Sequence, residues 1–183
     1  NATADKIRLV SFLFDRQSSW EDMDQYWLQG EGRTAFRVDM NYYLVDSHYS
    51  NISPDGNYRM DINYQTNSAT VFDRKSGEII VQLQPSGVYS SCFSPSGKFA
   101  ATGSQQGLIQ IWDTGTWKNI ASHKAREESV WCVQFSPDDS YLAYGLISGE
   151  ISIWDFHADQ ILYSNKAHLK PVVSLSFDMD GAR

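Results

Sequence analysis

The sequence predicts an all-β fold made of repeated small sheets, on two observations. The first is a Ser-Pro pair that recurs at intervals of 41 and 42 residues, at Ser53-Pro54, Ser94-Pro95 and Ser136-Pro137. The second is a closing aspartate that recurs at intervals of 40 and 42 residues, at Asp73, Asp113 and Asp155. Each copy reads as three short strands with turns between them, and a further strand follows. A period in the low forties with four strands per unit is typical of the blades of a β-propeller. The sequence therefore predicts a partial β-propeller of about three complete blades plus a fragment.

Residues 1–45 are expected to form an N-terminal segment with strands and one short helix. The apolar run from Ile7 to Phe14 has the length of a strand, and it either closes a preceding blade or latches the ring. Within residues 18–30, Trp20, Met23 and Trp27 share one face of a helical insertion, which either docks on its own propeller or contacts a partner. Alternating apolar residues in 34–45 predict a strand that leads into the first blade.

Four units follow along the chain. Residues 46–84 are expected to form a degenerate blade, 85–124 and 125–167 two regular blades, and 168–183 the truncated start of another. Two residues after each Ser-Pro turn stands an aromatic side chain that should pack between neighbouring sheets, namely Tyr58, Phe99 and Tyr141. Because the last unit holds only one strand and its turn, we expect the sequence to be a piece of a longer protein.

Two repeats close on a Trp-Asp pair, at Trp112-Asp113 and Trp154-Asp155, in phase with the Ser-Pro turns, and His168 begins the last unit. On these residues the sequence from about residue 48 to 183 resembles the WD-repeat family, and His168 is similar to the family's Gly-His entry into a blade. These five positions are the expected structural residues of the repeat. Members of the family are mostly non-catalytic platforms that hold proteins together. The resemblance therefore implies a protein-protein interaction scaffold, within a larger WD-repeat protein or a multi-subunit complex.

The hydrogen-bonded set of the family is incomplete here. In the family, a His before the first strand, a Ser or Thr on the second, an Asp in the next turn and the Trp of the third strand are linked. The turn position holds Thr66, Gln106 or Ser148 instead of Asp. His123 precedes its blade with three extra residues, and Tyr144 stands where the preceding blade has Thr. We expect these changes to remove buried polar links and leave a degenerate propeller.

Composition narrows the classes of function. The net charge of −7 argues against direct binding of nucleic acid, which needs clustered Lys and Arg. No apolar run is long enough for a membrane span. Cys92 and Cys132 are expected to be free buried thiols, which favours a reducing compartment and a cytoplasmic location, with a nuclear one as the alternative. No catalytic, metal or cofactor motif is recognisable, so we predict that the chain is not an enzyme.

A partner-binding site is predicted where the first strands begin. Four residues before the apolar residue that ends each first strand stand His48, Tyr89 and Trp131. Either they form an aromatic arc that anchors a partner, with Trp131 as the best single candidate, or they pack between blades. The alternative function is a regulatory propeller domain of a larger enzyme, such as an NTPase or a ubiquitin-ligase subunit, with its catalytic part outside these residues.

Overall fold

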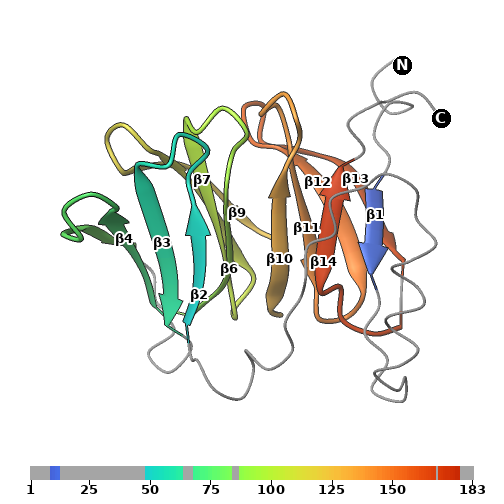
Figure 1. Ribbon diagram of the computed structural model, residues 1–183. Helices are drawn as coiled ribbons and strands as arrows, with labels where there is room; N and C mark the ends of the chain where they lie inside the picture. Colours follow the sequence, from blue (N-terminus) through green and yellow to red (C-terminus); the bar gives the residue numbers. More distant parts are fainter. Residues whose placement is uncertain (1–8, 13–47, 64–67, 84–86, 168, 178–183) are drawn as a thin grey trace, which may run out of the picture.

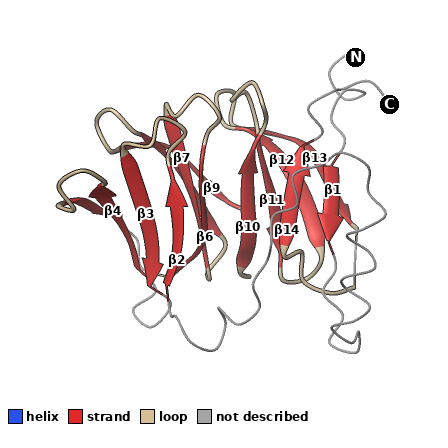
Figure 2. Ribbon diagram, in the orientation of Figure 1, coloured by secondary structure: helices blue, strands red, loops and turns tan. Residues whose placement is uncertain are grey.

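The computed structural model describes residues 9–12, 48–63, 68–83, 87–167 and 169–177, and the regular structure within these ranges is strand throughout (Figure 2). Three antiparallel four-stranded sheets stand beside one another in chain order (Figure 1), which confirms the predicted propeller blades. The helix predicted over 18–30, the strand predicted within 34–45 and His168 lie outside the described residues.

Within each sheet the strand order follows the chain. The first blade comprises β2 (His48–Ile52), β3 (Tyr58–Asn63), β4 (Ser68–Asp73) and β5 (Ile79–Leu83). The second comprises β6 (Val88–Phe93), β7 (Phe99–Ser104), β8 (Leu108–Asp113) and β9 (Lys118–Lys124). The third comprises β10 (Val130–Phe135), β11 (Leu142–Leu146), β12 (Glu150–Asp155) and β13 (Gln160–Lys166).

The opening strand of the last unit pairs with a strand from the other end of the sequence. This strand, β14 (Ser174–Phe177), is antiparallel to β1 (Leu9–Phe12), and Leu9 lies opposite Phe177. The strand expected in the apolar run at the N-terminus is thus confirmed. Strand β1 thus pairs with the opening strand of the final repeat.

The recurring serine and aspartate each close a turn of their own blade. The hydroxyl of each Ser-Pro serine accepts the backbone N–H five residues later, at 2.9 Å for Tyr58, 3.2 Å for Phe99 and 2.9 Å for Tyr141. Each closing aspartate accepts the backbone N–H three residues later, at 2.8 Å for Ser76, 2.8 Å for Thr116 and 2.9 Å for Ala158. Short polar side chains that bond to nearby backbone stabilise turns, so these bonds account for both landmarks of the repeat.

The apolar core lies between the blades. One cluster joins the first and second sheets, another joins the second and third, and a third joins the third sheet to β14. The ring of Tyr58 packs edge-on against Trp117 of the next blade at 5.4 Å, and Phe99 packs in the same way against Phe156 at 5.6 Å. Tyr141 packs against the cluster that contains β14 residues. The predicted placement of these aromatic side chains between sheets is confirmed.

Candidate interaction surface

Neighbouring blades are joined through their first strands. Each first strand lies at the edge of its sheet, and side chains hydrogen-bond from one first strand to the backbone of the next. The amide Nδ2 of Asn51 donates to the carbonyl of Ser91 at 2.7 Å, and the hydroxyl of Ser90 donates to the carbonyl of Val130 at 3.2 Å. The thiol of Cys132 donates to the carbonyl of Val172 at 3.1 Å. These bonds hold the row of first strands in register.

Two glycines allow this close approach of the blades. A Cβ atom at Gly103 would lie 2.6 Å from the Val130 side chain, and one at Gly145 would lie 2.6 Å from the Val172 side chain. Real Cβ atoms do not approach that closely, so each glycine makes room for the buried valine of the next blade. The close packing at Gly103, against the side chains of Ser90 and Val130, therefore fixes the strands next to Tyr89 and Trp131.

Tyr89 and Trp131 occupy matching β-bulges. The ladder between β6 and β7 shifts its register between Val88 and Ser90, so Tyr89 is the extra residue of a bulge. The ladder between β10 and β11 shifts in the same way between Val130 and Cys132, around Trp131. A bulge re-aims the side chain of the extra residue. Both aromatic side chains are partly exposed, whereas Val88 and Val130 beside them are buried.

His48 is placed differently from the other two predicted partner-binding residues. It begins β2 and lies opposite Asn63, with no bulge in that ladder. The structure describes its backbone but not its side chain. At the equivalent place before β14, Val173 is 36% exposed, next to the fully buried Val172. The structure thus brings Tyr89 and Trp131 to matching sites on adjacent blades, and a valine follows at the next site.

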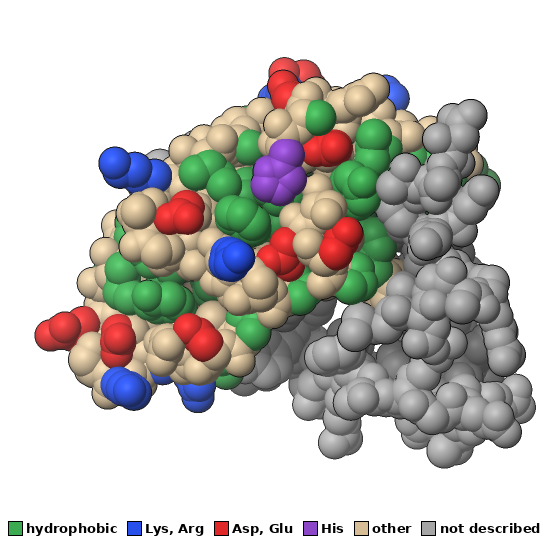
Figure 3. All heavy atoms as spheres, turned by 90° about the horizontal axis from the view of Figure 1, so that it is seen from above, with side chains coloured by type: hydrophobic (Ala, Val, Ile, Leu, Met, Phe, Trp, Pro, Cys, Tyr) green, Lys and Arg blue, Asp and Glu red, His purple; other side chains and the backbone are tan. Residues whose placement is uncertain are grey.

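We call the end of the sheets where β6 and β10 begin the entry face; it comprises residues 87–89, 105–107, 125–131 and 147–149. The opposite end, which carries the Ser-Pro turns, we call the turn face. Figure 3 looks down on the turn face, where apolar and acidic side chains are interspersed. There the carboxylate of Asp139, a residue with φ of 61°, accepts a hydrogen bond from the Ser94 hydroxyl at 3.1 Å and so joins the turns of two blades.

The structural tryptophans keep polar partners although the family's set is incomplete. The Nε1–H of Trp112 donates to Thr102 Oγ1 at 3.0 Å, and both residues are buried. In the next blade, Trp154 Nε1–H donates to Asp159 Oδ1 at 3.1 Å. The expected loss of polar links is therefore only partial.

The third blade also gains a link from its atypical tyrosine. The hydroxyl of Tyr144 lies 3.3 Å from Nε2 of His123, whose ring packs against Trp154 with centroids 5.2 Å apart. The extra residues after His123 thus do not prevent it from reaching its blade. Burial lowers the pKa of His123, so the neutral imidazole is the form that fits this site.

The two cysteines are unsuited to nucleophilic or metal chemistry. Both thiols are free and buried, and burial raises the pKa of each to about 12. A thiol rather than a thiolate is therefore present near neutral pH. Within the part of the chain that the structure describes, no group of three or more His, Cys, Asp or Glu side chains could hold a metal ion.

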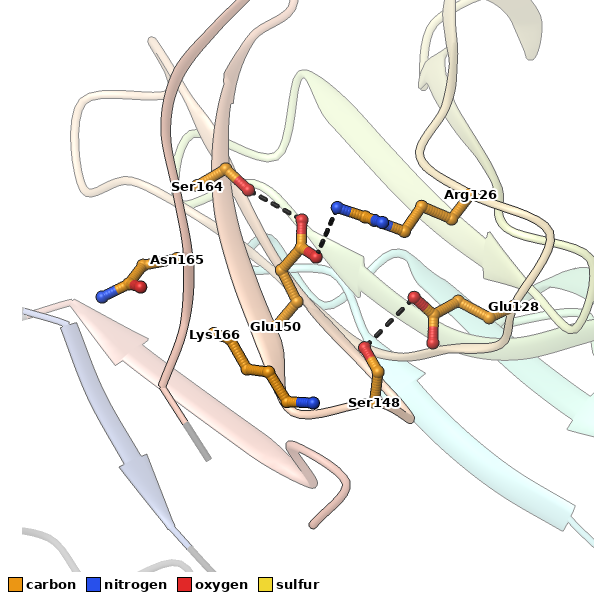
Figure 4. Close-up of a pocket in the computed structure, with 7 residues that line it drawn as sticks. All are labelled: Arg126, Glu128, Ser148, Glu150, Ser164, Asn165 and Lys166. Carbon is orange, nitrogen blue, oxygen red and sulfur yellow. Dashed lines mark hydrogen bonds and ion pairs between the residues drawn. The ribbon is translucent and has the colours of Figure 1, made fainter. Parts of the chain in front are cut away.

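A polar pocket lies on the entry face beside the outer edge of the third blade (Figure 4). Its volume is about 460 Å³, and its walls come from three segments, with Arg126, Glu128, Ser148, Glu150, Ser164, Asn165 and Lys166 as the lining residues. Arg126 Nη2 and Glu150 Oε2 form an ion pair at 2.8 Å. The repeat pattern marks Ser148, as a turn position, but it does not mark the other lining residues, because they are distant in sequence and meet only in the folded blade.

The family model for the WD domain, G-beta repeat, matches residues 77–113 and 117–155. These residues are WD repeats. Each matched stretch runs from the outermost strand of one sheet through the first three strands of the next, so a WD repeat of the sequence spans two blades of the structure. The first copy, which lacks the Trp-Asp pair, lies mostly outside the match.

WD repeats are in general non-catalytic modules for protein-protein interaction, and they support a scaffold role for this chain. No curated protein matches the chain. Among the described residues, no helix has the length and apolar character needed to cross a membrane.

Proposed function

We propose that this chain is a non-catalytic scaffold that binds a protein partner on its entry face, with Trp131 as the main anchor and Tyr89 beside it. The observation that carries the proposal is the pair of matching bulges. Two adjacent blades each insert an extra residue at the same place, and in both blades that residue is a partly exposed aromatic. Bulges of this kind commonly aim a side chain for function.

The surroundings of the two side chains suit a binding role. Interface anchors are typically Trp, Tyr or Arg side chains held on a rigid frame, because little conformational entropy is then lost on binding. The buried Val88 and Val130 and the close contact at Gly103 hold the frame here. We infer further that the partner belongs to a multi-subunit assembly in the cytoplasm, where the two free thiols would stay reduced.

Capture of partners with matched variants tests the proposal. The immobilised chain, its Trp131→Ala and Tyr89→Ala variants and a His157→Ala control on the turn face are exposed to the same cell extract, and captured proteins are compared by mass spectrometry. We expect at least one partner to be retained by wild type and His157→Ala and to be reduced about tenfold or more by Trp131→Ala, which corresponds to about 1.4 kcal/mol.

Circular dichroism separates binding from folding in this experiment. Trp131→Ala should keep the wild-type spectrum and urea midpoint, because the side chain is only partly buried. Unchanged capture by Trp131→Ala, or a variant that unfolds, would assign Trp131 to packing between blades and contradict the proposal.

A further inference from the structure

We infer that the polar pocket on the entry face binds a carboxylate borne by a peptide, that is, an Asp or Glu side chain of the partner. The inference rests on the proposed function only in taking the partner to be a protein. A volume of about 460 Å³ lies in the range of ligand sites, and it is large enough for one acidic side chain with its flanking backbone. The lining residues are all polar or charged, which selects against an apolar side chain.

Part of the pocket wall is already neutralised and fixed. Glu150 accepts the Ser164 hydroxyl at 2.7 Å through one oxygen and pairs with Arg126 through the other. Ser152 in turn donates to Ser164 at 3.0 Å. With both oxygens engaged and only 16% of its side chain exposed, Glu150 is a structural carboxylate of the wall. The charged groups that remain to face a ligand are Lys166 and Glu128.

Two groups remain to bind a ligand. The ammonium of Lys166 extends into the pocket toward Ser148 (Figure 4) and has no ion-pair partner among the described residues. Glu128 accepts the Ser148 hydroxyl at 3.1 Å through Oε1, which leaves Oε2 as an acceptor. The complementary ligand therefore carries one negative charge for Lys166 and an N–H donor for Glu128. An acidic residue in a peptide has both, in its side-chain carboxylate and its backbone amide.

Glu128 also limits the charge of the ligand. Inorganic phosphate carries between one and two negative charges at neutral pH, and the Glu128 carboxylate would repel it more strongly than it repels a single charge. A carboxylate carries one, which Lys166 can balance. The position of the pocket supports a peptide, because Arg126 and Glu128 lie in the connection that leads directly to Trp131.

Titration of the ¹⁵N-labelled 183-residue chain with acetyl-Gly-Asp-Gly-amide, followed by amide chemical shifts, tests the inference. We expect saturable shifts at residues 126–128, 148–150 and 164–166, with at least tenfold weaker binding of acetyl-Gly-Asn-Gly-amide and of inorganic phosphate. Lys166→Gln should weaken the Asp peptide about tenfold. Lys166→Arg and the control Lys118→Gln, which alters an exposed lysine at the start of β9, should bind as wild type does.

Several outcomes would overturn the inference: no saturable shift at these residues, equal binding of the Asn peptide, tighter binding of phosphate, or no effect of Lys166→Gln. Lys166 is exposed, so its variants should fold. The experiment is separate from the test of the scaffold role. If Trp131→Ala loses partner capture but the wild-type chain binds no peptide, the scaffold proposal stands and the pocket proposal is wrong. Trp131→Ala should leave the peptide titration unchanged.

Discussion

The hydrogen bond between Trp112 and Thr102 should contribute measurably to stability, and a double-mutant cycle isolates it. Both residues are buried, with 7% and 4% of their surfaces exposed, and the N···O distance is 3.0 Å. Trp112→Phe leaves the Thr102 hydroxyl without its donor, and Thr102→Val leaves the indole N–H without its acceptor. Each single substitution should lower the free energy of unfolding by about 1–3 kcal/mol, because it leaves a buried polar group without its partner. Trp112→Phe should cost more than this, because it also removes packing.

The double variant should cost less than the sum of the two, because it leaves no buried polar group unpaired. We expect a coupling free energy of about 1–2 kcal/mol. The third blade provides the comparison for this coupling free energy. There Trp154 donates to Asp159, whose exposed carboxylate can hydrogen-bond to water when the indole is removed. The cycle of Trp154→Phe with Asp159→Gly should give a coupling below about 0.5 kcal/mol, in the range of exposed pairs.

Urea unfolding followed by far-ultraviolet circular dichroism measures both cycles, because this signal comes mainly from the backbone and survives replacement of a tryptophan. The slopes with urea must agree among the variants for the free energies to be compared. A coupling near zero for Trp112 and Thr102, or one smaller than that for Trp154 and Asp159, would refute the argument that the buried bond is the stabilising one.

Three further outcomes follow from the packing and the buried groups. Gly145→Ala should cost about 1–3 kcal/mol in urea unfolding, because its Cβ would overlap the next blade, whereas the control Gly115→Ala, with its nearest neighbour 3.6 Å away, should be near neutral; equal effects would contradict this. Cys92 and Cys132, whose pKa values burial raises to about 12, should not react with a thiol reagent at pH 8 until urea unfolds the chain, and rapid labelling of the native protein would disprove their burial. Burial lowers the pKa of His123 below 6.5 in the folded chain. As the pH falls, the unfolded chain therefore protonates this imidazole before the folded chain does, and the free energy of unfolding should decrease from pH 7.5 toward pH 5. An NMR titration of His123 that gives a pKa of 6.5 or above would contradict it.

The blades were predictable because their signals are local. The Ser53 hydroxyl bonds to backbone five residues later, and the Asp73 carboxylate to backbone two and three residues later, so the sequence pattern and the bonds have the same short range. Such turns recur wherever the residues recur, whatever the rest of the chain does. The period, the strand order and the aromatic packing positions follow from them.

The features that distinguish the entry face from the turn face could not be predicted from the sequence, because they form only when the blades pack together. In the sequence Asp139 has the pattern of an ordinary turn residue, yet its carboxylate accepts a hydrogen bond from Ser94 in the turn of the preceding blade. A bulge at Trp131 adds one residue to one strand of a pair, and neither strand alone carries a mark of that difference in length. Arg126 and Glu150 form an ion pair only because the connection between two blades folds over the third sheet. Contacts between residues that are distant in sequence depend on how whole sheets stack, and stacking is a property of three-dimensional packing that the local pattern does not contain.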